Sequence, residues 1–94
     1  MIQAIDGPVV YINKSVTTTA SELRVGGAPL EERKLLLIQP KGNSIFIGTD
    51  SSVTSSNGIE IFKDQIMPVE VSDKVTVYAI ASSGSIDVRI WEMA

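Results

Sequence analysis

The feature that most limits the folds open to this chain is the alternation of apolar and polar side chains. Successive side chains of an extended strand point to opposite faces, so a period of two indicates a β-strand with one buried face. Near the end of the sequence, apolar residues recur with this period of two: Val75, Val77 and Ala79, and then Ile86, Val88 and Ile90. A chain built this way favours sheets over helices.

Turn residues separate the alternating segments at intervals typical of a sandwich or small barrel. The sequence SSGS predicts a hairpin between residues 74–81 and 86–91. A second hairpin is predicted between 34–39 and 44–48, because the intervening residues combine a proline, a glycine and an asparagine. We therefore expect an all-β, single-domain fold, either a β-sandwich or a jelly-roll-like small barrel.

The apolar run LLLI at residues 35–38 does not alternate, which predicts a central strand with both faces covered. Pro68 is expected at an edge or bulge, since proline donates no ladder hydrogen bond. A short helical turn is possible at 20–23, and VGGAP at 25–29 predicts a loop. Further extended segments are expected at 8–12, 15–19, 59–62 and 65–71.

Size and charge narrow the classes of partner. The 94 residues suffice for one modest core, and 44% hydrophobic with 20% charged residues is ordinary for a globular domain. The net charge of −3 offers no surplus of cations to a phosphate backbone or an anionic membrane surface. We expect no nucleic-acid and no membrane partner, and interpret Arg33, Lys34 and Lys41 as solvated strand ends.

The chain contains neither cysteine nor histidine, which removes thiolate and imidazole chemistry and the usual zinc ligands. The carboxylates lie in turns or on polar strand faces, where nothing raises a pKa for acid catalysis. They are Asp50, Glu60, Asp64, Glu70, Asp73 and Asp87. We predict no enzyme activity, no metal and no cofactor.

Aromatic side chains and one polar loop are the candidate contact residues. Alternation turns Trp91 away from the apolar face formed by residues 86, 88 and 90, so it either packs under a second layer or is exposed as an interface anchor. Phe46 has the same ambiguity. The predicted protein interface comprises Tyr11, Phe46, Asp50, Ser51, Ser52, Val53, Thr54 and Trp91.

Six segments follow one another in a distinctive order: VTTTA at 16–20, RKLLLIQ at 33–39, IFIG at 45–48, VTSSNGI at 53–59, VYAIA at 77–81 and DVRIWE at 87–92. Together they resemble small virion proteins of tailed bacteriophages. The resemblance covers most of the chain from Val16 to Glu92. The chain departs from the family pattern at Pro40, where Asn is usual, and at 62–71, where the common Pro-Gly turn is absent.

This resemblance implies a non-enzymatic structural protein of the virion, assembled in the bacterial cytoplasm. A capsid decoration protein that binds the major capsid protein or another virion protein is the first expectation, as a homo-oligomer and specifically a trimer. A tail or head–tail accessory subunit is the alternative within this class. A glycan-binding module that stacks sugars on Trp91, Tyr11 or Tyr78 is the alternative from another class.

The resemblance also divides the chain. Residues 1–15 precede the resembling segments and are expected to form an extended N-terminal arm, and residues 16–94 are expected to form the β-sandwich domain. Such an arm could dock on a neighbour as an added strand.

Overall fold

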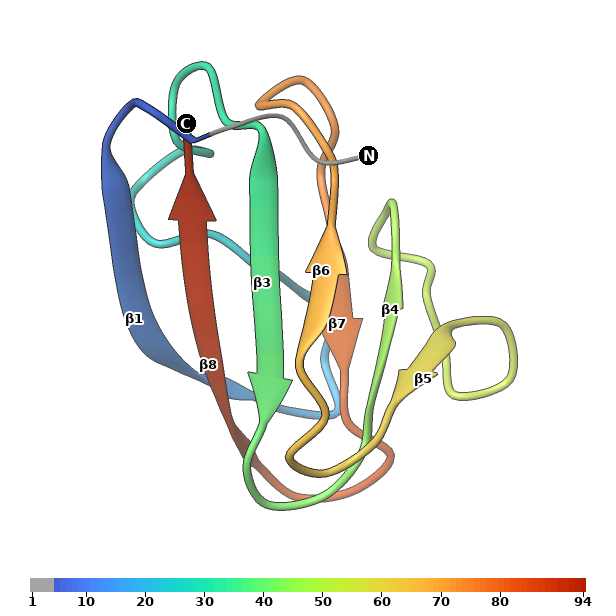
Figure 1. Ribbon diagram of the computed structural model, residues 1–94. Coiled ribbons are helices and arrows are strands. Elements are labelled where there is room, and N and C mark those ends of the chain that lie inside the picture. Colours follow the sequence, from blue (N-terminus) through green and yellow to red (C-terminus); the bar gives the residue numbers. More distant parts are fainter. Residues whose placement is uncertain (1–4) are drawn as a thin grey trace.

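The computed structural model describes residues 5–94, which form eight β-strands and no helix. The strands are β1 (Val9–Val16), β2 (Ser21–Glu22), β3 (Leu35–Pro40), β4 (Ile45–Gly48), β5 (Ile59–Ile61), β6 (Met67–Val69), β7 (Tyr78–Ile80) and β8 (Ile86–Met93). They form two four-stranded antiparallel sheets, the first in the order β1-β8-β3-β6 and the second in the order β2-β7-β4-β5 (Figure 1). The predicted all-β sandwich is confirmed. No helix that could cross a membrane occurs in this part of the chain.

The strand order is that of an eight-stranded jelly roll. Most consecutive strands change sheets: β1, β3, β6 and β8 belong to the first sheet, and β2, β4, β5 and β7 to the second. Within residues 5–94, β4 and β5 are the one pair adjacent both along the chain and in a sheet. Figure 1 shows the first sheet in front, with β1 along its left margin.

Both predicted hairpins are wrong, because the chain crosses between the sheets at each turn. Strand β7 lies in the second sheet and β8 in the first, although the SSGS turn between them reverses the chain with Gly84 at a φ of 65°. Strands β3 and β4 are separated in the same way. A crossing and a hairpin leave the same alternation in the sequence, since either arrangement buries one face of each strand.

Residues 9–15, expected in an arm outside the sandwich, are part of the sandwich. They form β1, whose pairing with β8 runs from Val9 opposite Met93 to Val16 opposite Ile86. Pairing along eight residues satisfies the main-chain groups on one side of β8. The domain therefore begins earlier than residue 16, and residues 1–4 of the expected arm lie outside the described residues.

Strand β3 is central, as predicted, and lies between β8 and β6. Pro68 lies in the edge strand β6, also as predicted. The prediction that both faces of β3 are covered is only partly right, because Leu36 and Ile38 are fully buried whereas Leu37 is half-buried on the outer face. At the possible helical turn, residues 21 and 22 form β2 instead.

The core lies between the sheets and is built from the inward-facing residues of the alternating strands. Strand β8 contributes Ile86, Val88 and Ile90, as its pattern predicts. The other core residues are Val16, Leu23, Leu36, Ile38, Ile45, Ile47, Ile61, Val77, Ala79 and Ala81. Burial of this apolar surface is the main driving force for closing the two sheets on each other.

A fully buried carboxylate lies near the end of β8. The side chain of Glu92 accepts hydrogen bonds from the main-chain N–H groups of Val25, at 2.7 Å, and Leu30, at 3.1 Å. Its Oε2 atom also lies 2.8 Å from Nη1 of Arg33. Glu92 therefore holds the loop between β2 and β3 against the first sheet.

Arg33 is also buried, with 2% of its surface exposed, so its interpretation as a solvated strand end is wrong. Its guanidinium donates to the main-chain carbonyl oxygens of Val71, Ser72 and Val75, at 3.3, 2.9 and 2.7 Å. The planar guanidinium can serve several acceptors at once because it carries five N–H donors. The ion pair thus ties a second loop, between β6 and β7, to the end of β8.

Candidate interaction surface

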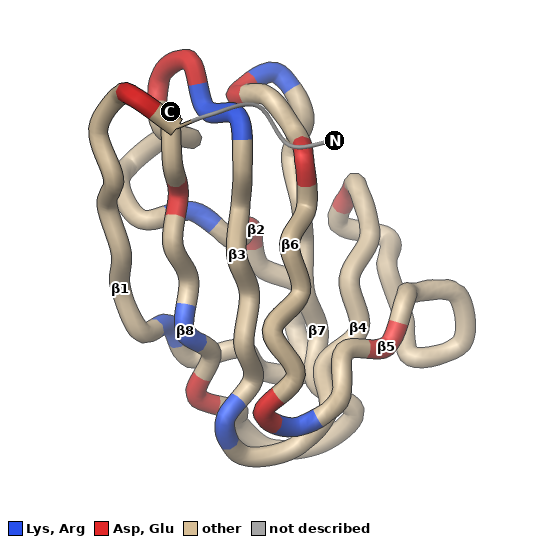
Figure 2. Tube along the Cα trace, viewed as in Figure 1, with Lys and Arg blue, Asp and Glu red and all other residues tan. Residues whose placement is uncertain are grey.

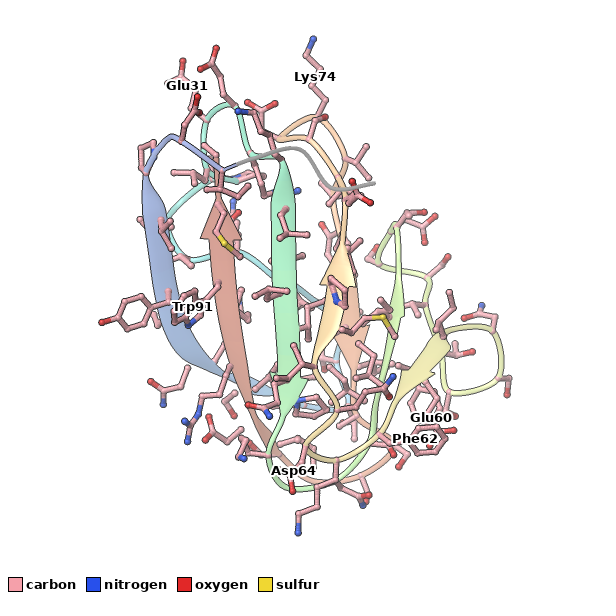
Figure 3. All side chains as sticks on the ribbon, viewed as in Figure 1. Glu31, Glu60, Phe62, Asp64, Lys74 and Trp91 are labelled. Carbon is pink, nitrogen blue, oxygen red and sulfur yellow. The ribbon has the colours of Figure 1, made fainter. Side chains whose placement is uncertain are left out.

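Two aromatic side chains, Tyr11 and Trp91, lie together on the outer face of the first sheet, and Figure 3 labels Trp91. Tyr11 and Trp91 are directly opposite in the β1–β8 register, with ring centroids 5.3 Å apart and planes inclined by 31°. Tyr11 is 68% exposed and Trp91 is 46% exposed. Trp91 points away from the buried Ile90, as the alternation predicts, and no second layer of residues 5–94 covers it.

Next to the aromatic pair, further apolar residues lie on the same outer face, so that apolar side chains extend across all four strands of this sheet. Leu37 lies opposite Trp91, and Pro68 lies opposite Leu37. Ile66, just before β6, is 62% exposed and borders with Leu37 and Trp91 a shallow hollow of about 260 Å³. We call these five residues, Tyr11, Trp91, Leu37, Pro68 and Ile66, the apolar strip.

Polar side chains border the apolar strip on the side toward the start of β8. Asn13, Gln39 and Arg89 line a second hollow, of about 680 Å³, together with the two aromatic residues. Arg89 is paired with the carboxylate of Asp87 at 3.2 Å, and both are substantially exposed. In Figure 2 most charged residues lie toward the ends of the strands. An apolar centre with a polar border is typical of a protein-binding surface.

The loop between β4 and β5, residues 49–58, is folded around Val53. This side chain is buried, so it supports the loop and is not the contact residue that was predicted. A Cβ atom built on Gly48 would lie 2.9 Å from Val53 Cβ, and one built on Gly58 would lie 2.8 Å from Val53 Cγ2. The two glycines leave the space that Val53 occupies.

Polar groups of the same loop bond one another. Asp50 Oδ1 accepts hydrogen bonds from Oγ of Ser52, at 2.5 Å, and from its main-chain N–H, at 2.9 Å. These bonds, the side-chain one first, lower the pKa of the Asp50 carboxyl below its ordinary value because they stabilise the charged form. Thr54 N donates to Asn57 Oδ1 at 2.7 Å, and Gly58 N donates to Thr54 O at 2.9 Å. These internal hydrogen bonds therefore fix the conformation of the loop and the positions of its exposed side chains.

Replacing Gly58 by alanine is expected to lower the free energy of unfolding by about 1–3 kcal/mol, the usual effect of overpacking. The new Cβ would lie within 3.0 Å of Val53 Cγ2, Phe46 Cβ and Thr54 O, so the loop or β4 must shift. Urea denaturation followed by circular dichroism measures the change. Gly27→Ala is the matched control, because a Cβ there meets nothing within 4 Å. Equal losses in the two variants would contradict the packing of this loop.

The structure divides the predicted contact residues into separate regions. Tyr11 and Trp91 are together on the first sheet, whereas Phe46 lies half-buried on β4 in the second sheet. Of the contact residues predicted in the loop, Asp50, Ser51, Ser52 and Thr54 are exposed. This loop follows β4, on the right in Figure 1, and Trp91 lies at the left in the same view (Figure 3).

The other residues around the aromatic pair were not predicted from the sequence as contact residues: Asn13, Leu37, Gln39, Ile66, Pro68 and Arg89. Leu37 lies in an unbroken apolar run, so the sequence carries no alternation that would mark it as outward-facing. Its position follows only from the register with Trp91. Ile66 had a usable signal, since it lies two positions before Pro68 and so on the same side of an extended segment, whereas Met67 and Val69 pack against the core.

Exposed carboxylates away from the apolar strip are either bonded locally or solvated. Asp64 is paired with Lys41 at 2.8 Å, and this hydrogen bond lowers the pKa of its carboxyl. In residues 5–94 no three Asp or Glu side chains converge closely enough to hold a metal ion. No family model, curated protein or solved structure matches this chain.

Proposed function

We propose that this chain is a non-enzymatic structural protein of a phage virion that decorates the capsid by binding its protein lattice. The main observation that supports a binding surface is the apolar strip, which crosses all four strands of the first sheet. A decoration protein needs such a face, because non-covalent contacts with the assembled capsid protein must supply all of its binding free energy.

The residue types of the apolar strip, and their position on paired strands with a polar border, support the proposal that its partner is a protein. Tyr and Trp are the residue types that most often dominate the binding energy of protein interfaces. Tyr11 and Trp91 are held on paired strands of a sheet, so little main-chain entropy is lost when a partner covers them. The polar groups of Asn13, Gln39 and Arg89 can bond a partner at the border while water is excluded from the centre.

The assignment to a virion is supported by the resemblance of segments 16–92 to small phage virion proteins. The jelly-roll strand order is compatible with it, since capsid proteins use this architecture. Lectin domains use it too, and a fold does not by itself identify a function. The surface must therefore be tested directly.

The first test uses virions produced from the genome that encodes this chain. We expect the chain to band with purified particles in a density gradient and to be detected there by mass spectrometry. Separation of heads from tails then distinguishes a capsid decoration protein, found with the heads, from a tail or head–tail accessory subunit. Absence from purified virions would contradict the proposal.

The second test concerns the apolar strip. Particles that lack the chain are mixed with purified wild-type protein or with the Trp91→Ala variant. We expect the variant to bind at least about 30-fold more weakly, because truncating a central aromatic anchor costs about 2 kcal/mol or more. Phe62→Ala is the control, since this exposed aromatic residue lies away from Trp91 in Figure 3. Equal binding by wild type and Trp91→Ala would place the interface elsewhere.

A glycan-binding module is a second candidate, favoured by one observation. The 680 Å³ hollow combines the two aromatic rings with amide and guanidinium groups, and sugars use both for stacking and hydrogen bonding. A glycan array would show a selective signal that Trp91→Ala abolishes without loss of fold. No signal on the array, together with decoration of heads, would exclude this function.

A further inference from the structure

The four edge strands of the sandwich are unequally protected against pairing with another strand. Edge strands β2, β5 and β6 contain two or three residues each, and β6 also carries a proline. Strand β1 contains eight residues, Val9–Val16, and no proline. Short length and proline are common ways of blocking an edge, so β1 is the open edge of this domain.

The hydrogen-bonding groups on the open side of β1 follow from its pairing with β8. Ala94 N donates to Pro8 O, so the even-numbered residues of β1 bond β8 and the odd-numbered ones face outward. Outward-facing main-chain groups thus belong to Val9, Tyr11, Asn13 and Ser15. No described residue forms a main-chain hydrogen bond to these groups.

The charged residue of β1 does not guard this edge. Lys14 turns toward the second sheet, where its Nζ atom donates to the main-chain oxygen of Glu22 at 2.5 Å. Its ammonium group therefore lies between β1 and β2 and does not project outward from the edge of the first sheet. A lysine that pointed outward along the edge would repel a second copy of the strand.

Strand β1 also exposes apolar side chains on both of its faces. Val9 and Tyr11 lie on the outer face and are 45% and 68% exposed. Ile12 lies on the opposite face and is still 42% exposed, because the neighbouring edge of the second sheet is the two-residue β2. Ile12 also borders the hollow beside Tyr11 and Trp91. A strand added at the edge would cover apolar side chains on both faces of β1.

We propose that β1 pairs with β1 of a second copy of this chain, antiparallel and about a two-fold axis, to form one continuous eight-stranded sheet. The strand is complementary to itself in free main-chain groups and in apolar pattern. Its one charge is the inward-held Lys14, so no acidic or basic edge partner is required. This inference concerns the isolated chain and does not rest on the proposed virion role.

The side chains select one register. When Tyr11 faces Tyr11 of the second copy, Val9 faces Asn13 and Val10 faces Ile12, so apolar residues meet on both faces. The register that places Lys14 opposite its own copy would put Tyr11 opposite Thr17, which lies beyond the end of β1. In the selected register the outward-facing groups of Tyr11 bond those of its copy, and the two apolar strips join across the axis.

The first experiment measures self-association of the full chain by sedimentation equilibrium. One strand pair is a small interface, and we expect a reversible dimer with a dissociation constant of about 10–100 µM. Asn13→Pro removes an outward N–H and no bond to β8, and is expected to raise this constant at least about tenfold. Asn13→Ala keeps the N–H and should change it by less than about threefold. Circular dichroism verifies that both variants are folded.

The second experiment tests the register by disulfide cross-linking, which is unambiguous because the chain has no cysteine. In the selected register the two cysteines that Tyr11→Cys introduces, one in each copy, have Cα atoms about 5.5 Å apart, within disulfide reach. The two that Asn13→Cys introduces are offset by four residues, about 14 Å. Under mild oxidation we expect Tyr11→Cys to form covalent dimers at least about tenfold faster.

Three results would overturn the proposal. They are a monomer at all concentrations to about 500 µM, a dimer that Asn13→Pro leaves unchanged, and Asn13→Cys cross-linking as fast as Tyr11→Cys. Particle binding by a strictly monomeric chain that Asn13→Pro abolishes would assign the edge to a partner's strand instead. Failure of particle binding with the dimer intact would overturn only the proposed function.

Discussion

Replacing Glu92 by alanine is expected to lower the free energy of unfolding by about 3–5 kcal/mol, a large part of the stability of a domain of this size. The substitution leaves the buried guanidinium of Arg33 without its counter-charge, which lies at 2.8 Å. It also removes the acceptor for Val25 N and Leu30 N. Urea denaturation followed by circular dichroism measures the loss.

Two further variants show whether the loss comes from the ion pair. Glu60→Ala removes an exposed carboxylate on β5 and should change stability by no more than about 0.5 kcal/mol. Arg33→Met combined with Glu92→Ala should cost less than the sum of the single changes, because the double variant buries no unpaired charge. Strict additivity would contradict a direct interaction between the two side chains.

Replacing Ile38 by alanine is expected to lower the free energy of unfolding by about 2–5 kcal/mol, whereas Leu37→Ala should cost about 1 kcal/mol or less. The two residues are neighbours on β3, but Ile38 is fully buried between the sheets and Leu37 is half-buried on the outer face. Truncating Ile38 leaves a cavity in the core. Truncating Leu37 removes contacts at a surface that solvent already reaches.

The same pair separates stability from binding. Leu37 belongs to the apolar strip, so Leu37→Ala should weaken binding to particles that lack the chain while the domain remains folded. Ile38→Ala should bind as wild type at temperatures where it is folded. If Leu37→Ala destabilises the domain as strongly as Ile38→Ala, the outer face of β3 is covered and the proposed interaction surface is wrong.

The two proposals describe connected parts of one surface. Tyr11 belongs both to the apolar strip and to the open edge of β1, so pairing of two β1 strands would unite two strips into one wider face. A dimer would then bind a repeated lattice through two linked surfaces, and the second contact would form at a high effective concentration. This arrangement is two-fold, in contrast to the trimer expected from the resemblance.

The strand content and the facing of individual side chains were largely predictable from the sequence. The sequence predicts Trp91 opposite the buried face of β8, residues 35–38 in the centre of a sheet and Pro68 at an edge or bulge, and the structure agrees, with Pro68 in the edge strand β6. These features depend on the period of the chain and on the backbone chemistry of single residues. Such properties are local and can be read within a few positions.

The candidate surface was only partly predictable. Tyr11 and Trp91 were both singled out as aromatic candidates, but they lie at opposite ends of the chain and nothing in the sequence indicates that they are opposite each other in a sheet. Val53 was misassigned, since the two glycines that enclose it are recognisable as its neighbours only in the folded loop. Arg33 was misread because a scattered cation is usually solvated, and its partner Glu92 lies 59 positions away.

The sequence by itself determined an all-β domain and which side of the alternating strands faces inward, because alternation reflects the geometry of an extended chain. The tertiary structure decided which strands are neighbours, and so turned two expected hairpins into crossings between sheets. It also decided that β1 is an open edge, that Arg33 and Glu92 meet in the interior, and that the apolar strip is continuous. The physical reason is that these features arise from contacts between residues distant in sequence, whose free energies depend on the whole packed arrangement.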